Sequence, residues 1–282
     1  MFNDIFSIGP VTFHMYGLMS AIGILAAYFF AEHRAKKENL DTDGIIYFVI
    51  ACLVAGYIGS KLLYFCTILP QVLEDPSIIK DSITGGWVVY GGIIGGMIGG
   101  GLYCKKKGLP SWKYFDLGLT AMALAQGFGR IGCLCAGCCY GVETKSALSI
   151  VFTNSAYAPN GVHLVPTQIA SSLFDFLLFF VMLLYFEHKQ KNDGEVTGIY
   201  LIAYSLGRFG IEFLRGDLER GAVGALSTSQ FIALFTFALG IIIFFKRRKA
   251  ESPMESAETA RDMEEEQTTE QDLQEGQMPL NK

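Results

Sequence analysis

Residues 127–141 read GFGRIGCLCAGCCYG and combine a permanent positive charge with a group of cysteines. Arg130 lies at the end of an apolar run, and four cysteines follow within seven residues, from Cys133 to Cys139. A guanidinium at the edge of hydrocarbon is costly unless an anionic group meets it, so an intramembrane arginine marks a functional site by default. We therefore interpret the rest of the chain as a membrane bundle that holds this charge.

The composition is typical of a polytopic membrane protein. Hydrophobic residues make up 51% of the 282 positions, charged residues only 17%, and glycine occurs 32 times, which suits helices that pack closely in lipid. Residues 250–282 contain ten acidic and two basic side chains, a net charge of −8 that leaves +3 on residues 1–249 from the overall −5. We expect a membrane domain over residues 1–249 and a disordered acidic cytoplasmic tail over residues 250–282, because the tail has too little aliphatic surface to fold.

Seven apolar runs of about 17–24 residues are each long enough to cross a hydrocarbon core of roughly 30 Å. They cover residues 11–32, 44–66, 87–104, 114–132, 166–187, 195–215 and 227–246. The sequence thus predicts an all-α, polytopic membrane protein with seven transmembrane helices.

Basic residues in the short loops predict the orientation of these spans. Lysine and arginine follow the first, third, fifth and seventh spans, near residues 34–37, 105–107, 189–191 and 246–249. If the spans alternate, all four groups lie on one side, which the positive-inside rule identifies as the cytoplasm. The N-terminus is then outside and the C-terminus is cytoplasmic.

Other charges lie within the spans or at their outer ends. Lys61 falls in the second span, Arg208 and Glu212 are one turn apart on one face of the sixth, and Arg215 follows at its outer end. Cations outnumber carboxylates in this outer half, and the planar guanidinium of arginine binds phosphate through two hydrogen bonds. Charge and topology alone predict a membrane protein that handles an anionic lipid.

Structural explanations for these groups remain open. Lys61 can extend to the outer surface, and Arg208 with Glu212 can form a self-neutralising pair. Gln126 and Asp175 are expected to be hydrogen-bond partners between helices.

Pairs of glycines in the third span, at residues 91–92, 95–96 and 99–100, leave one helix face as bare backbone. A neighbouring helix can approach such a face closely. Gly91 and Gly92, which follow Tyr90 near the outer surface, are also candidates to admit a lipid headgroup.

The spacing C-x-C-x-x-C-C over residues 133–139 leaves three interpretations open. Zinc sites usually pair two such motifs or add histidines at set spacing, and no second motif is present, so we expect no metal site. A thiol beside Arg130 has a lowered pKa, which keeps a redox role open. The favoured interpretation is structural, with cysteine as a small residue at a tight helix end.

Several segments follow one another in an order typical of one family. They are FHMYGLMSAIG (13–23), GYIGSKLLYF (56–65), GGWVVYGGIIGG (85–96), GFGRIG (127–132), PTQ (166–168) and YSLGRFGIEFLRGD (204–217) with LSTSQ (226–230). Over residues 1 to about 247 the chain resembles prolipoprotein diacylglyceryl transferase, a bacterial membrane enzyme. This family moves diacylglycerol from phosphatidylglycerol onto the lipobox cysteine of a prolipoprotein. The resemblance implies a multi-pass protein of the bacterial plasma (cytoplasmic) membrane.

The resemblance also implies the partners and the site. The partners are phosphatidylglycerol, prolipoprotein signal peptides with a lipobox cysteine, and membrane lipids; no nucleic acid, metal or cofactor is expected. Catalysis is assigned to Arg130, Arg208, Glu212 and Tyr90. Binding of the phosphatidylglycerol headgroup is assigned to Arg130, Lys61, Tyr16, Arg215, Gly91, Gly92 and Gln168.

In the implied reaction a substrate thiol attacks the glycerol carbon that bears the phosphodiester, and glycerol phosphate leaves. Arg130 and Arg208 are then expected to stabilise the phosphate in a low-dielectric pocket. Glu212 is the preferred base if Arg208 does not hold it as a fixed partner, and His14 and His163 are weaker alternatives. The positive field alone can also lower the pKa of the substrate thiol.

The chain departs from the family pattern at positions that bear on chemistry. Tyr90 stands where the family has histidine, and Cys133 where it has asparagine after Gly-Arg-x-Gly. With an unperturbed pKa near 10, a tyrosine does not easily serve as the base. A divergent transferase, a paralogue that binds an anionic lipid with a different acceptor, a membrane thiol-redox protein and a non-catalytic lipid-binding protein all remain open.

Overall fold

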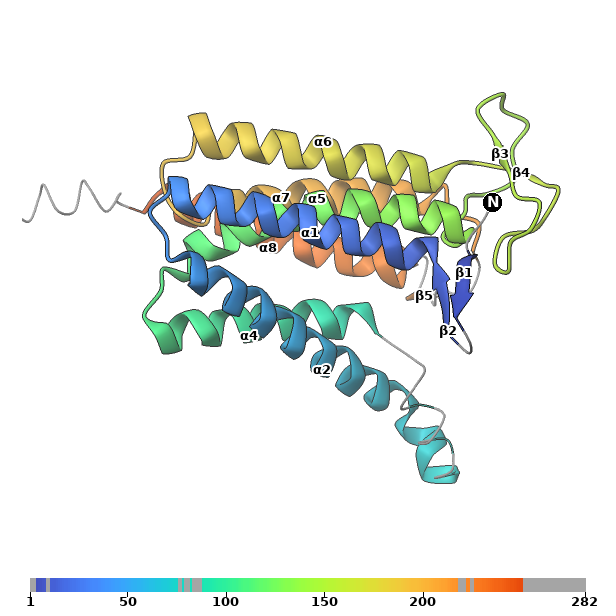
Figure 1. The fold of residues 1–282 in the computed structure, drawn as a ribbon, viewed down its shortest axis with the longest axis horizontal. Coiled ribbons are helices and arrows are strands. Elements are labelled where there is room, and N and C mark those ends of the chain that lie inside the picture. The colour runs from blue at the N-terminus through green and yellow to red at the C-terminus, as the bar shows by residue number, and fades with distance from the viewer. Residues whose placement is uncertain are drawn as a thin grey trace, which may run out of the picture.

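The computed structural model describes residues 4–8, 11–75, 78, 82, 88–217, 222–223 and 226–250. This part of the chain is mostly helical (Figure 1). Its long helices are α1 (Met15–Lys37), α2 (Thr42–Glu74), α4 (Val89–Lys107), α5 (Ser111–Ala136), α6 (Thr167–His188), α7 (Glu195–Glu212) and α8 (Thr228–Arg248). The acidic tail predicted for the C-terminus lies beyond the described residues.

Three antiparallel pairs of short strands lie beside the helices. They are β1 (Asp4–Ile8) with β2 (Val11–His14), β3 (Ile150–Val151) with β4 (His163–Leu164), and β5 (Ala222–Val223) with β6 (Leu226–Ser227). In Figure 1 the β1–β2 and β3–β4 pairs are at the same end of the helices, so that end carries most of the non-helical residues that the structure describes.

Within the described residues, five helices are long and apolar enough to cross a membrane: α1, α2, α5, α6 and α8. The protein is therefore a polytopic membrane protein. Each of the seven predicted spans falls on one long helix. Helix α4 has only 19 residues and ends in three lysines, Lys105–Lys107, and α7 has 18 residues that include Glu195, Arg208 and Glu212, so each has a shorter uncharged stretch.

The predicted span limits were wrong in several places. The first span was expected from residue 11, but Val11–His14 forms β2 and α1 begins at Met15. The all-α prediction missed this hairpin because its aromatic residues also suit an apolar helix. The rings of Phe6 and Phe13 stack across the two strands at 4.6 Å, which stabilises the hairpin. Helix α2 is longer than predicted and ends at Glu74.

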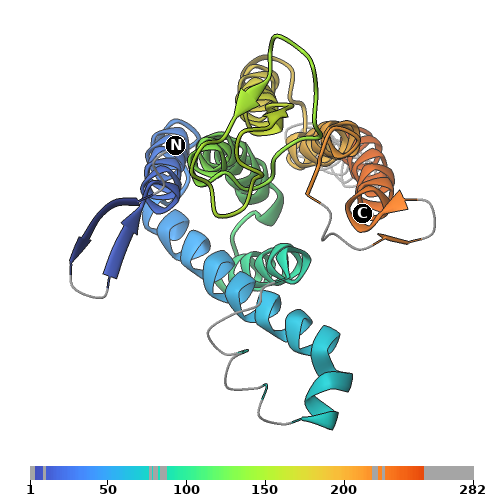
Figure 2. The ribbon, with the colours of Figure 1, turned by 90° about the vertical axis from the view of Figure 1, so that its right-hand side faces the viewer.

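Helix α5 lies in the middle of the bundle, against α1, α6 and α7, and α7 packs against α8. Helices α2 and α4 pack against each other, and α2 runs away from the other helices along its length (Figures 1 and 2). Apolar side chains of α5, α6 and α7 form one buried cluster that includes Ala123, Phe179, Met182 and Val196. This cluster fixes the three helices on which the predicted site residues stand.

A buried carboxylate sets the relative position of α5 and α7. Asp116, near the start of α5, accepts hydrogen bonds from the backbone N–H of Gly194 at 2.6 Å and of Thr197 at 2.7 Å, and from the Thr197 hydroxyl at 2.6 Å. The two helices therefore start at the same end of the bundle and run parallel. At 1.5 Å per residue, Arg130 stands about 21 Å beyond Asp116 and Arg208 about 17 Å beyond Thr197. Both arginines thus reach the same, opposite end.

The glycines of α4 allow the backbones of α2 and α4 to contact each other directly, as predicted. A Cβ atom on Gly56 of α2 would lie 3.0 Å from the carbonyl oxygen of Gly92, and one on Gly95 would clash with the Ala55 carbonyl. Real Cβ atoms do not come this close to backbone. Helix packing in lipid uses such small residues because close contact replaces the hydrophobic effect.

We expect Gly95→Ala to lower the thermal stability of the purified protein in detergent, because the added methyl group forces α2 and α4 apart. Overpacking of this kind costs about 1–3 kcal/mol. Gly101→Ala on the same helix is the matched control: its Cβ would meet only the Phe115 ring, at 3.9 Å. The control should be neutral or stabilising, since alanine is favoured over glycine in a helix by about 1 kcal/mol. Equal melting temperatures for the two variants would contradict the close contact.

Candidate functional site

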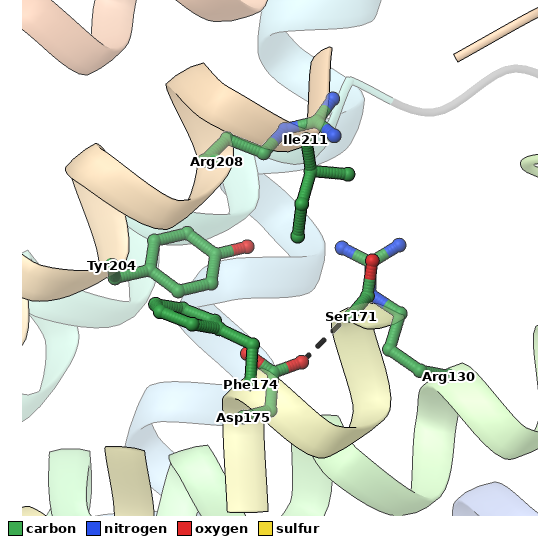
Figure 3. Close-up of a pocket in the computed structure, with 7 residues that line it drawn as sticks. All are labelled: Arg130, Ser171, Phe174, Asp175, Tyr204, Arg208 and Ile211. Carbon is green, nitrogen blue, oxygen red and sulfur yellow. Dashed lines mark ion pairs between the residues drawn. The ribbon is translucent and has the colours of Figure 1, made fainter. Parts of the chain in front are cut away.

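A small pocket lies between α5, α6 and α7, and two arginines from different helices line it (Figure 3). Its lining residues are Arg130 of α5, Ser171, Phe174 and Asp175 of α6, and Tyr204, Arg208 and Ile211 of α7. In Figure 3 the guanidinium groups of Arg130 and Arg208 reach toward the same space from their two helices. The predicted convergence of these two charges is therefore confirmed.

Arg130 faces one buried carboxylate across a gap. Its Nε atom lies 3.9 Å from Oδ2 of Asp175, whose side chain is 3% exposed. This separation exceeds hydrogen-bond distance, and the Arg130 guanidinium donates no hydrogen bond to another described residue. Asp175 was expected to be a hydrogen-bond partner between helices; its Oδ2 atom instead faces Arg130 without a hydrogen bond. The donors of Arg130 remain available to an anionic ligand.

Arg208 is held more firmly. Its Nη2 atom lies 2.9 Å from Oε2 of Glu212 and donates to the Ser229 hydroxyl at 2.9 Å. Arg215 approaches the same Glu212 oxygen at 4.0 Å and also pairs with Asp217. Glu212 is therefore a fixed partner of Arg208, which is the condition under which it was not expected to serve as the base.

The predicted surplus of positive charge is smaller than expected. Lys61 is not among the pocket residues; its ammonium donates to the carbonyl of Ser82 at 3.0 Å. Helix α2, which carries Lys61, diverges from the α5–α7 bundle, and Lys61 does not line this pocket. Asp175 adds a carboxylate that the sequence count left out.

The chain turns sharply after α5 and returns to its last helical turn. Gly137 caps α5 in the left-handed conformation, with φ of 76°, and Cys139 also has a positive φ of 58°. The sulfur atoms of Cys133, Cys138 and Cys139 consequently lie within 4.8 Å of one another. Cys135 is not part of this group, which we call the thiol cluster.

Two residues at the start of α6 hold the backbone of this turn. The hydroxyl of Thr167 donates to the Cys139 carbonyl at 2.8 Å, and the amide of Gln168 donates to the Cys138 carbonyl at 2.9 Å. Both side chains are almost fully buried. Gln168 was predicted to bind a headgroup; that role stays a prediction, while the contact it makes here supports the cysteine turn.

The segment after α7 is hydrogen-bonded to the segment after the thiol cluster. The N–H of Val142 donates to the Leu214 carbonyl at 2.9 Å, and the N–H of Gly216 donates to the Tyr140 carbonyl at 2.9 Å. Arg215 lies between these two bonds. Hydrogen bonds from Cys133 and Cys138, and to a smaller extent the charge of Arg215, hold the pKa of Cys139 below that of an ordinary thiol.

The structure places the remaining predicted residues as follows. The half-exposed Tyr16 stands at the start of α1, with its ring against Gly132, where a Cβ atom would lie 3.2 Å from the ring. Gly91 and Gly92 belong to the contact between α4 and α2. Tyr90 is in α4, and its side chain lies outside the described ones. Their roles at the headgroup and in catalysis stay predictions.

The family model for prolipoprotein diacylglyceryl transferase matches residues 3–246. The chain belongs to this family. A phosphatidylglycerol–prolipoprotein diacylglyceryl transferase from Clostridium tetani is 48% identical over 242 residues, which cover 83% of this chain and 96% of the relative. One from Clostridium perfringens is 44% identical over 231 residues (82% and 90%), and one from Finegoldia magna is 31% identical over 244 residues (86% and 95%). The resemblance inferred from the sequence motifs is confirmed.

Four pocket residues of this diacylglyceryl transferase family member were not predicted. They are Ser171, Phe174, Tyr204 and Ile211. Helical spacing could have found them: residues 171, 174 and 175 lie on one face of α6, and residues 204, 208 and 211 lie on one face of α7. The sequence analysis followed charges alone, and these side chains carry none at neutral pH.

We expect Thr167→Val to loosen the cysteine turn, because it removes the hydroxyl that donates to Cys139 but keeps the side-chain shape. Alkylation of Cys138 and Cys139 by a maleimide, followed by mass spectrometry on the folded protein, should then be several-fold faster. The matched control is Thr120→Val, since that buried hydroxyl donates only within α5, to the Asp116 carbonyl at 2.7 Å. Equal alkylation rates in both variants would show that Thr167 does not hold the turn.

Proposed function

We propose that this protein transfers the diacylglyceryl group of phosphatidylglycerol to the lipobox cysteine thiol of prolipoproteins. Membership of the family and 48% identity to a relative named for this reaction support the assignment. The single observation in the fold that carries it is the pocket in which Arg130 and Arg208 meet. Two guanidinium groups in one partly buried pocket suit the phosphate of a lipid headgroup.

We also propose that all seven long helices cross the bacterial plasma membrane, with the N-terminus outside and the C-terminus in the cytoplasm. Contacts between the basic helix ends support this. Arg34 at the end of α1 pairs with Glu187 at the end of α6 at 2.8 Å, and Arg247 at the end of α8 donates to the Asp193 carbonyl before α7 at 2.6 Å. The basic ends thus lie together, as the positive-inside rule requires. The arginine pocket is at the other, outer end.

In the proposed reaction the phosphate of the donor lipid lies between Arg130 and Arg208. The sulfur of the substrate cysteine attacks the glycerol carbon, a C–S bond forms, and the C–O bond to phosphate breaks. The leaving glycerol phosphate takes the electron pair, so the site must stabilise its charge where water is scarce. Arg130, whose donors are not engaged by other described residues, makes the new contacts, and Glu212 holds Arg208 in place.

Headgroup contacts beyond these two arginines follow the family resemblance. We propose Arg215, Tyr16, Lys61, Gly91, Gly92 and Gln168 for this role and Tyr90 as a further catalytic residue. Arg215 and Tyr16 are the best supported. Arg215 pairs through its backbone with Gly141, shortly after α5, and the ring of Tyr16 lies against Gly132, two residues after Arg130. Gln168 acts through the cysteine turn, whose backbone it holds.

The direct test supplies purified protein with phosphatidylglycerol labelled in its acyl chains and with a lipobox peptide. We expect label on the peptide as a thioether, together with one released glycerol phosphate per transfer. The control peptide carries serine in place of the lipobox cysteine and should accept nothing. A folded protein that binds the lipid but labels neither peptide would be a lipid-binding paralogue, and the proposed function would be wrong.

Arg130→Lys tests the phosphate contact. Lysine keeps the charge but loses the planar pair of donors, so we expect transfer to fall roughly 10²–10³-fold, as when one donor to a developing anion is removed. The control is Arg248→Lys, an exposed arginine at the opposite end of the bundle that donates to the Tyr185 hydroxyl. It should transfer at the wild-type rate. Full activity in Arg130→Lys, with both variants folded, would contradict the role of Arg130.

A further inference from the structure

The thiol cluster has the geometry of a metal-binding site. Cys133, Cys138 and Cys139 place their sulfur atoms within 4.8 Å of one another. Zinc binds thiolate sulfur at about 2.3 Å, so three sulfurs of a tetrahedral site lie roughly 3.8 Å apart. The three side chains therefore need to close by only about 1 Å to surround one ion. Rotation about their side-chain bonds supplies a movement of this size.

A disulfide accounts for this arrangement less well. A disulfide joins two sulfur atoms and does not explain why a third cysteine sulfur lies close to both. Cys138 and Cys139 are also neighbours in sequence, with Cα atoms about 3.8 Å apart, which is below the usual range for a disulfide of roughly 4.4–6.8 Å. Three mutually close thiols match the three-cysteine set that zinc uses in proteins.

The fold holds the cluster in place through a left-handed turn and two buried side chains. The left-handed turn at Gly137 reverses the chain, and Cys139 adopts a φ of 58°, which is unfavourable for a residue with a side chain. The buried side chains of Thr167 and Gln168 each bind a carbonyl of this turn. Ligand positions that are supported in this way by surrounding hydrogen bonds are typical of built metal sites.

The charges around the cluster also favour a bound ion. Three thiolates and one Zn²⁺ carry a net charge of −1. Arg215 pairs through its backbone with Gly141, two residues after Cys139. Arg130 is three residues before Cys133, on the same face of α5. The cluster therefore lies directly beside the arginine of the proposed active site.

We propose that Cys133, Cys138 and Cys139 bind one Zn²⁺ and that its fourth coordination position takes the thiol of the acceptor cysteine. The second half of this proposal rests on the proposed transferase function. Among the described residues only these three cysteines form a candidate metal-ligand group, so the set has three protein ligands, as in catalytic zinc sites with an open position. Zinc of this kind would favour deprotonation of the acceptor thiol. Glu212 does not serve this purpose because it is paired with Arg208.

The chemistry balances without an oxidant or reductant. The acceptor thiol loses its proton to water as its sulfur binds zinc, because a coordinated thiol is deprotonated. The resulting thiolate attacks the glycerol carbon, the C–S bond forms, and glycerol phosphate leaves with the electron pair of the broken C–O bond. The product sulfur is a neutral thioether, a weaker ligand than thiolate, and so dissociates from the ion.

The metal is tested first, without any substrate. Purified full-length protein, stripped with a chelator, is titrated with Co²⁺, whose sulfur-to-metal charge-transfer absorption reports thiolate ligands, and Zn²⁺ is then used to displace it. We expect one ion per chain. Cys138→Ser and Cys139→Ser should each weaken binding at least tenfold, while Cys135→Ser, the matched control from the same stretch outside the cluster, should bind as the wild type does.

Three results would overturn the metal site: no stoichiometric Co²⁺ or Zn²⁺ in folded wild-type protein, equal loss in Cys135→Ser, or a disulfide from Cys133 to Cys138 or Cys139 in protein purified without oxygen. Melting temperatures of the stripped proteins show whether each variant is folded. Because the wild-type chain is tested with and without ion, the result does not depend on the variants alone.

The open position is tested by adding lipobox peptide to the Co²⁺ protein. A peptide with cysteine should change the visible spectrum, and the same peptide with serine should not. If both peptides leave the spectrum unchanged, the acceptor does not bind the metal. A spectral change without thioether product would reject the proposed transferase function and keep the thiol site, whereas thioether formation by protein that binds no metal would reject the zinc proposal and keep the transferase.

Discussion

The hydrogen bonds of Asp116 are the constraint on which the geometry of the site depends. This buried carboxylate binds the first turn of α7 to the start of α5, and so fixes the two helices in parallel. Charged side chains inside a membrane bundle are tolerated only where partners or ligands meet them. With their helices aligned at one end, Arg130 and Arg208 arrive together at the other. A single anion can then contact both arginines. If the two helices were antiparallel, arginines at the same distances from the helix starts would lie at opposite ends of the bundle.

The two arginines differ in the side chains that surround them, and this difference suits the proposed transfer reaction. Arg208 is neutralised by Glu212 at 2.9 Å and is held by Ser229, so it is rigid before any lipid arrives. Arg130 has only Asp175 at 3.9 Å. Donors that are fixed in advance stabilise a developing charge without the cost of reorganising, and a donor that is not engaged supplies the new contact. Glu212 and Asp175 also lie beside the two arginines, and partners of this kind lower the cost of burying a cation.

The sequence predicted the helices well because the thickness of a membrane sets how long an apolar run must be, and each of the seven runs became a helix. It did not predict the β1–β2 hairpin, whose aromatic residues suit either structure. It predicted the meeting of Arg130 and Arg208 from charge. It did not predict that Lys61 lies outside this pocket, since the position of a helix in the bundle depends on contacts between helices, such as those of α2 with the glycines of α4. The thiol cluster could not be read from the spacing of its cysteines, because the left-handed turn at Gly137 and the hydrogen bonds from α6 bring the three sulfurs together.

Two departures of this chain from its family pattern, at Tyr90 and Cys133, can be explained together by a metal ion bound at the thiol cluster. Tyr90 replaces a histidine that suggested itself as a base, and Cys133 replaces an asparagine beside the signature arginine. A site that joins sulfur to carbon must still produce a thiolate. Of the two carboxyl groups beside its arginines, Glu212 is paired with Arg208 at 2.9 Å and Asp175 faces Arg130 at 3.9 Å. A metal ion at Cys133 would lower the pKa of the acceptor thiol by direct coordination, which is a stronger effect than a nearby cation exerts through space. In this proposal the loss of the histidine at position 90 and the gain of the cysteine at position 133 belong together, because a metal ion replaces a base in activating the acceptor thiol.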